Sequence, residues 1–100
     1  MQITMHNVPR SPALEQRIRA GAASLERQHP RLVSCRVTVE EPEGHHHKGG
    51  QFGVRIEVRA PGTGDDISSM KRHEDVYVAL RDALDATRRQ LEDVVRAARA

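Results

Sequence analysis

The stretch DVYVALRDALDATRRQLEDVVRAA, residues 75–98, carries the clearest structural pattern in the chain. At about 100° per residue, its apolar side chains gather on one face about 120° wide, which predicts an amphipathic helix. The members of that face are Tyr77, Leu80, Ala83, Leu84, Thr87, Leu91, Val94 and Val95. Glu74 and Asp75 stand at the start, where negative charge meets the positive end of the helix dipole. The rest of the fold must therefore supply a surface that this face can cover.

The side of this helix away from the core carries five arginines within an arc of about 100°: Arg81, Arg88, Arg89, Arg96 and Arg99. Their guanidinium groups extend along about 27 Å of helix and could contact several phosphates. Asp85 and Glu92 lie within the same arc, however. The possible i,i+4 pairs are Arg81–Asp85, Asp85–Arg89, Arg88–Glu92 and Glu92–Arg96. Such a ladder is typical of a solvated helix face, so the pattern alone favours that interpretation.

Two segments before this helix alternate polar and apolar residues, as half-buried strands do. Residues 32–40 place Val33, Cys35, Val37 and Val39 on one side, and residues 52–60 do the same with Phe52, Val54, Ile56, Val58 and Ala60. The polar loop 41–50 between them contains one proline and three glycines. The pair therefore predicts an antiparallel hairpin with one face in water.

The remaining elements follow from shorter signals. Ile3 and Met5 alternate with polar residues and predict a first strand, while Ser11-Pro12 is typical of a helix start. An apolar stripe follows at helical spacing and Pro30 ends it: Leu14, Ile18, Ala22 and Leu25. Residues 66–70 predict a short fourth strand with Ile67 inward. The predicted order is β-α-β-β-β-α, an α+β fold in which a four-stranded mixed sheet carries two helices on one face.

Length and composition limit the class of protein. The 100 residues suit a single domain spanning 1–100, with a net charge of only +2. One cysteine excludes an intrachain disulfide and fits a reducing compartment. No apolar run approaches the roughly 20 residues that span a bilayer, and the N-terminus lacks a signal-peptide pattern. We therefore expect a cytoplasmic protein without a membrane segment.

Few residues are candidates for a catalytic or metal-binding site. Cys35 alternates with valines, which predicts a buried small hydrophobe and not a nucleophile. His45-His46-His47-Lys48 is interpreted as a polar hairpin tip. The alternatives are contact with an acidic partner and metal binding. Metal binding is the weaker alternative, because adjacent histidines converge poorly on one ion. The segment 73–75 is interpreted as a helix cap. With no nucleophile elbow, glycine-rich phosphate loop or convergent carboxylate pair, we expect no enzymatic activity and no cofactor or metal.

The last helix also carries a recognisable motif. His73-Glu74-Asp75-Val76-Tyr77-Val78-Ala79-Leu80, followed by Arg89-Gln90-Leu91, closely resembles the signature helix of the bacterial ribosome hibernation-promoting factor family. This family is also called ribosome-associated inhibitor A or the sigma-factor modulation proteins. Ser11-Pro12-Ala13-Leu14 and Leu25-Glu26-Arg27 resemble the family's first helix. The resemblance covers nearly the whole chain and the same order of elements.

The resemblance implies a function and a set of partners. Family members bind the small ribosomal subunit, meaning its 16S rRNA and ribosomal proteins, during stationary phase or stress. They occupy the decoding region and sterically block messenger RNA and transfer RNA, without catalysis. Some relatives add a C-terminal dimerisation domain or a cold-shock domain, whereas we expect this chain to be a single ribosome-binding domain with neither. We therefore expect a protein that is monomeric when free and does not pair ribosomes by itself.

The resemblance and the arginine arc together predict an rRNA-binding set: Arg27, Arg81, Arg88, Arg89 and Arg96, with Lys48, Arg55 and Arg59 as secondary members. The chain departs from the family at three usually basic positions, Ser24, Ala86 and Asp93, which leaves open whether ribosome binding is weakened. A protein–protein interaction module, or a stress protein without RNA binding, is the alternative function. Its docking surface would be the helix face or the open sheet face: Arg36, Thr38, Arg55, Glu57 and Arg59.

Overall fold

The computed structural model describes residues 1–41, 50–61 and 66–99. Its elements are β1 (Gln2–His6), α1 (Pro12–Gln28), β2 (Ser34–Glu40), β3 (Phe52–Arg59), β4 (Ile67–His73) and α2 (Val76–Arg99). This order confirms the predicted β-α-β-β-β-α arrangement. The triple-histidine segment, Lys48 and the turn at 62–64 lie outside the described residues.

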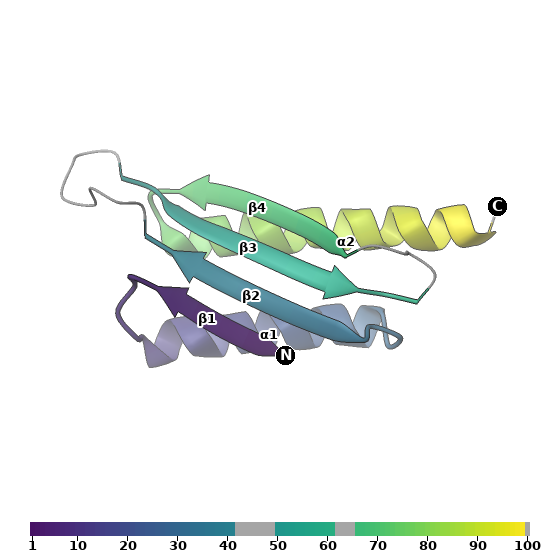
Figure 1. Cartoon of the computed structure of the whole chain (residues 1–100), viewed down its shortest axis with the longest axis horizontal. Helices are drawn as coiled ribbons and strands as arrows, with labels where there is room; N and C mark the ends of the chain where they lie inside the picture. The colour runs from purple at the N-terminus through teal and green to yellow at the C-terminus, as the bar shows by residue number, and fades with distance from the viewer. Residues whose placement is uncertain (42–49, 62–65, 100) are drawn as a thin grey trace.

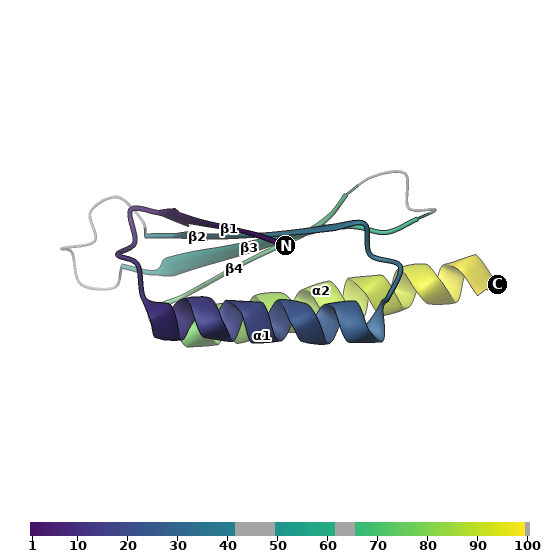
Figure 2. The same ribbon diagram turned by 90° about the horizontal axis from the view of Figure 1, so that it is seen from below.

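The sheet has the strand order β1-β2-β3-β4. β1 pairs parallel to β2, with Ile3 opposite Val37, and α1 forms the crossover between these two strands. β2 pairs antiparallel to β3, with Val37 opposite Ile56, and β3 pairs antiparallel to β4. Both helices lie on one face of the sheet and run in the same direction (Figures 1 and 2). The mixed sheet therefore has one covered face and one open face, as the sequence predicted.

The core lies between the covered sheet face and the two helices. The sheet contributes Cys35, Val37, Val39, Val54, Ile56, Val58 and Ile67. The helices contribute Leu14, Ile18, Ala22, Leu25, Ala79, Leu80, Ala83 and Leu91. Thr87 is also fully buried, and its hydroxyl donates to the carbonyl of Ala83 at 2.8 Å, so burial leaves no unpaired donor. The core is thus mainly aliphatic and lies between one layer of two helices and one layer of four strands.

Side chains cap both helices where the sequence predicted. The Ser11 hydroxyl accepts from the Leu14 amide at 3.3 Å, and Pro12 occupies the first helical position. At α2, Asp75 Oδ1 accepts from the Tyr77 amide at 2.9 Å, and the Asp75 amide donates to His73 Nδ1 at 2.9 Å. Each contact satisfies an amide that a helix start or its preceding turn would leave free. The assignment of segment 73–75 as a cap is confirmed.

Two predicted features differ from the structure. Val33 was expected to point into the core, but it precedes β2 and is 68% exposed. The turn after α1 directs Leu32 against the core instead, so the strand begins at Ser34 and its first buried residue is Cys35, two residues after Val33. β4 extends to His73 and not to Met70, and Ile67 is buried as expected. Residues 71–73, which the prediction did not include, are polar and exposed at this end of the edge strand. They therefore lack the alternation of polar and apolar residues that predicts a strand.

The buried face of α2 is displaced from the predicted one, because Ala79, which lies outside the predicted face, is fully buried. Tyr77 and Val95 stand at its margin and are each 37% exposed, because the helix rests on the sheet through residues centred on Ala83 and Thr87. No helix in the described part of the chain has the length and apolarity needed to cross a membrane.

Candidate nucleic-acid interface

The arginines of α2 do not form one surface. Arg81 and Arg88 line a groove between α1 and α2, whereas Arg89 and Arg96 do not. Arg88 and Arg89 are consecutive, so their side chains leave the helix about 100° apart. Arg89 is exposed and forms no ion pair or hydrogen bond with any described residue. The helix therefore offers two arginine pairs, one toward α1 and one away from it.

The predicted i,i+4 ladder is mostly wrong. Arg88 Nε lies 3.9 Å from Glu92 Oε1, but Arg81–Asp85, Asp85–Arg89 and Glu92–Arg96 do not form ion pairs in the described structure. The short aspartates pair with nearer arginines instead. These contacts are Arg81–Asp82 at 3.4 Å, Arg88–Asp85 at 3.6 Å and Arg96–Asp93 at 3.5 Å. Long, exposed ion pairs contribute about 0–1 kcal/mol each, so these arginines can exchange a carboxylate for another anion at little cost.

The groove between the helices has a volume of about 390 Å³. Its lining comes from both helices: Arg17, Ala20, Gly21, Ser24, Leu25 and Gln28 of α1, and Tyr77, Leu80, Arg81, Leu84, Asp85 and Arg88 of α2. The Arg17 guanidinium lies over the Tyr77 ring, 5.5 Å from its centroid, a cation–π contact. Three arginines and a single acid thus line the groove, which gives it a positive balance of charge.

The sequence patterns did not indicate Arg17, because it lies on the first helix and outside both the arginine arc and the family motif. A signal was available: Gly21 and Ser24 follow Arg17 along one side of α1, and small residues at helical spacing indicate a close approach of another helix. Arg27, which was predicted, is exposed in the last turn of α1, where a cation is favourable to the helix dipole.

Arg55 and Arg59 alternate along β3 with buried residues of the covered face, so they lie on the open face of the sheet, away from the helices. Arg59 Nε contacts Asp66 Oδ1 at 2.9 Å, whereas Arg55 is exposed and has no partner among the described side chains. The nearby Arg72 is paired with Glu40 at 3.3 Å. The structure therefore divides the predicted set between two opposite faces, and Lys48 lies outside the described residues.

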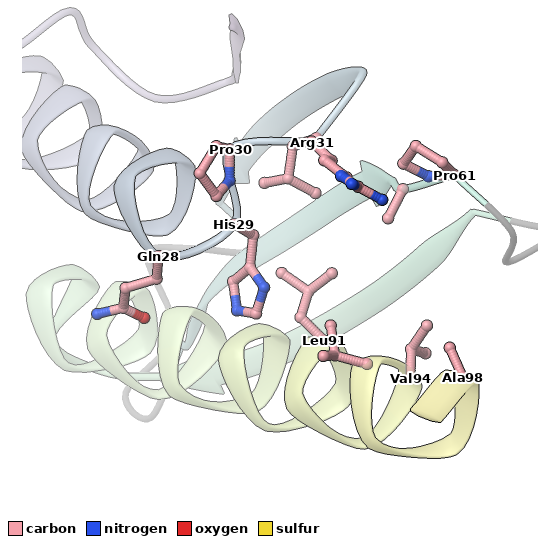
Figure 3. Close-up of a pocket in the computed structure, with 11 residues that line it drawn as sticks. Gln28, His29, Pro30, Arg31, Pro61, Leu91, Val94 and Ala98 are labelled. Carbon is pink, nitrogen blue, oxygen red and sulfur yellow. The ribbon is translucent and has the colours of Figure 1, made fainter. Parts of the chain in front are cut away.

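A second hollow, of about 580 Å³, lies where α2 extends beyond α1 (Figure 3). Leu91, Val94 and Ala98 form one wall, and His29 and Arg31 lie across from them. Most of its lining is aliphatic. Within residues 1–41, 50–61 and 66–99, no three His, Cys, Asp or Glu side chains gather as metal ligands would.

Cys35 is buried under the helices, as predicted. Burial raises the pKa of its thiol above the ordinary value of 9.0, and the negative charge of Glu26 raises it further. The thiol is therefore held in its neutral, unreactive form.

Comparison with known proteins agrees with this architecture. A ribosomal subunit interface protein from Coxiella burnetii superposes with a TM-score of 0.74 at 18% identity, covering 94% of this chain and 97% of that one. The N-terminal domain of Protein Y from Thermus thermophilus gives a TM-score of 0.69 at 17% identity, covering 93% and 94%. At these identities the likeness shows the fold. No curated protein matches the sequence significantly.

The family is shown by the sequence itself. Residues 1–98, nearly the whole chain, match the family described as sigma 54 modulation protein / S30EA ribosomal protein. That match agrees with the motif on α2 and with the order of strands and helices. The chain therefore belongs to the sigma 54 modulation protein / S30EA ribosomal protein family, a family of ribosome hibernation factors that are not enzymes.

Proposed function

We propose that this protein binds the small ribosomal subunit near the decoding region, in the cytoplasm, and sterically blocks messenger RNA and transfer RNA. Membership of the family supports association with the ribosome. The description of the Coxiella burnetii relative as a ribosomal subunit interface protein points the same way.

The observation that carries the proposal is the exposed arginine set on the helical side. Arg27 on α1 and Arg81, Arg89 and Arg96 on α2 are exposed on helices that a common core holds rigid. Guanidinium groups match phosphate geometry and need no particular base sequence. Structured RNA is recognised mainly through shape and backbone, so such a surface suits rRNA.

The arginines on the open sheet face support a binding position in which RNA contacts both faces of the protein. Arg55 and Arg59 lie on the open sheet face, opposite the helix arginines, so one flat RNA surface cannot contact both sets. A protein inserted into a channel is contacted on both faces. We infer that Arg55 and Arg59 face one wall while the helix arginines face the other.

Cosedimentation with isolated 30S and 70S particles through sucrose, at rising salt, tests the binding. We expect the protein to travel with both particles at low salt and to be released as salt rises, because phosphate contacts release counterions. Absence from the particle fractions even at low salt would overturn the proposal and favour a protein–protein module.

A second measurement tests the blocking step separately. Filter binding of transfer RNA to 30S subunits carrying messenger RNA should fall as the protein is added in stoichiometric amount. If the protein stays on the subunit while transfer RNA binds as before, the site is elsewhere on the ribosome and steric occlusion is wrong.

A further inference from the structure

The end hollow, the cavity of about 580 Å³ where α2 extends beyond α1, differs in chemistry from the arginine surfaces of the helices. The last turns of α2 line one side of it with Leu91, Val94, Val95 and Ala98 (Figure 3). Val95 is 37% exposed and Val94 is half-buried, so the core does not cover this aliphatic wall. An apolar surface at the end of the molecule is therefore left accessible to another molecule.

The opposite side of the end hollow adds hydrogen-bond donors. His29 and Arg31, from the turn that follows α1, lie across from the aliphatic wall (Figure 3). The Arg31 side chain is exposed and forms no ion pair or hydrogen bond with any described residue. The described residues that line the hollow include no aspartate or glutamate. The charge of the hollow is therefore complementary to an anion that also carries an apolar part.

The dimensions of the end hollow favour a small molecule over a partner protein. Its aliphatic wall runs from Leu91 to Ala98, a rise of about 10 Å along α2. A stable protein–protein interface buries about 800 Å² on each partner, which is more surface than about two turns of one helix provide. Small-molecule sites are mostly apolar, contain a few polar groups and typically have volumes of about 300–1,000 Å³. The end hollow has all three properties.

The donors of the end hollow limit the charge of that small molecule. A guanidinium group binds a carboxylate through two parallel N–H···O bonds, so Arg31 alone can pair with a monoanion. A nucleotide or polyphosphate would need several cations, whereas Arg31 is the only Lys or Arg among the described residues that line the hollow. The same residues include no Phe, Tyr or Trp on which a base could stack. The chemistry that fits is a single carboxylate on a saturated chain.

We propose that the end hollow binds a medium-chain fatty acid. Its carboxylate pairs with Arg31, and its alkyl chain lies against Leu91, Val94 and Ala98. His29 is the second donor on the carboxylate side, because an imidazole can donate a hydrogen bond in either charge state. The inference goes beyond the proposed function, since neither Arg31 nor the aliphatic wall belongs to the predicted rRNA-binding set.

The first test is a titration with sodium decanoate, whose extended chain is comparable in length to the aliphatic wall. The whole protein is followed by NMR, at decanoate concentrations below those that form micelles. The methyl signals of Leu32, Leu91 and Val94 should shift and saturate. Octanoate, which is shorter by two methylenes, should bind about tenfold more weakly, because each buried methylene contributes up to about fourfold. Absence of a saturable shift at these three residues, or shifts that begin only with micelles, would overturn the proposal.

The second test compares Arg31→Ala with Arg19→Ala. Arg19 is exposed on α1, does not line the end hollow and has no ion-pair partner among the described residues, so both variants lose one charge. We expect Arg31→Ala to weaken decanoate binding about tenfold and Arg19→Ala to change it less than twofold. Decyltrimethylammonium, a cation on the same alkyl chain, should bind the wild type at least about tenfold more weakly than decanoate. Equal binding of the two probes would mean that the carboxylate is not recognised, and the proposal would be wrong.

The third test fills the end hollow. Ala98→Phe places a ring at a position that lines the hollow, whereas Ala97→Phe places the same ring at an exposed neighbour that does not line it. Decanoate binding should fall more than about tenfold in Ala98→Phe and persist in Ala97→Phe, with circular dichroism verifying that both variants are folded. Unchanged binding in Ala98→Phe would overturn the proposal.

A second copy of the chain is the other occupant that these experiments detect. If the methyl signals of Leu32, Leu91 and Val94 shift with protein concentration in the absence of decanoate, and sedimentation equilibrium shows a dimer, the end hollow is an interface between two copies and the fatty-acid assignment is wrong. All of these measurements are made without ribosomes, so their outcome is independent of the proposed function.

Discussion

Leu84 of α2 packs directly onto Gly21 of α1, so closely that a Cβ atom at position 21 would collide with the Leu84 Cδ1 methyl. The glycine therefore sets how near the two helices can come. Since Arg17 and Arg81 belong to different helices, their shared groove depends on this contact. A glycine in a helix interior costs about 1 kcal/mol relative to alanine, so the close approach is maintained against helix propensity.

The Gly21–Leu84 contact predicts a strong coupling between the two positions. In a Leu84→Ala background, Gly21→Ala should stabilise the protein by about 1 kcal/mol through helix propensity. In the wild type, a displaced Leu84 rotamer should cancel much of that gain. Urea denaturation of the four proteins should give a coupling energy of about 1 kcal/mol. Ala23→Gly, on another side of α1, serves as the control and should cost the same in both backgrounds; coupling near zero for Gly21 would contradict the close packing.

Removing the cap of α2 should destabilise the whole fold. Asp75→Ala deletes the acceptor of the Tyr77 amide, which should lower the free energy of unfolding by about 1 kcal/mol and Tm by about 4–8 °C. Glu74→Ala is the matched control, because the Glu74 side chain is exposed and forms no hydrogen bond or ion pair with a described residue. A Tm loss in Glu74→Ala equal to that in Asp75→Ala would point to the helix dipole and not to the cap.

Charge reversal should separate the two neighbouring arginines of α2. Arg89→Glu should leave the free energy of unfolding within about 0.5 kcal/mol, because Arg89 is exposed and unpaired among the described residues. Arg88→Glu should be destabilising, because it places a third carboxylate beside Asp85 and Glu92. Under the proposed function, both single variants should weaken cosedimentation with 30S subunits, and the double variant should abolish it. Wild-type cosedimentation of the double variant, folded by circular dichroism, would remove the helical side from the ribosome interface.

The buried thiol predicts a loss of stability at alkaline pH. Burial, and then Glu26, raise the pKa of Cys35, so the folded state keeps the proton that the unfolded state releases above its ordinary pKa of 9.0. The stabilisation of the folded state by the protonated Cys35 thiol is complete below pH 9 and is lost as pH rises toward the folded-state pKa. Urea denaturation across this range, with a reductant present, should show a steeper decline for the wild type than for Cys35→Ala. Parallel declines would mean that the thiol does not contribute.

The order of elements could be predicted because its signals are local. These signals are the alternation in Phe52–Arg59, the hydroxyl and proline of Ser11-Pro12, and the Asp75 carboxylate before α2. Each acts within a few residues, and the structure uses all three. Val33 misled the prediction because alternation does not reveal where a strand begins. That boundary depends on the turn after α1, which sends Leu32 inward.

The candidate site was less predictable than the fold. Helical periodicity placed the α2 arginines on the polar side, but it cannot show which of them meet another helix. Arg88 lines a groove with Arg17, whereas Arg89, about 100° further round the helix, does not. The ion pairs differ from the prediction because Arg88 and Arg96 pair with Asp85 and Asp93, three residues before them, a spacing that the i,i+4 pattern does not include.

The last turns of α2 extend past the end of α1 (Figure 2). Thr87 and Leu91 are buried, whereas residues 95–98 are exposed and Val94 is half-buried. Opening the end of this helix therefore uncovers little apolar surface, while opening it at Thr87 requires disruption of the core. Amide hydrogens should accordingly exchange with deuterated solvent in sequence, from the C-terminal end inward, so that one continuous helix holds a gradient of protection from local fraying to global unfolding.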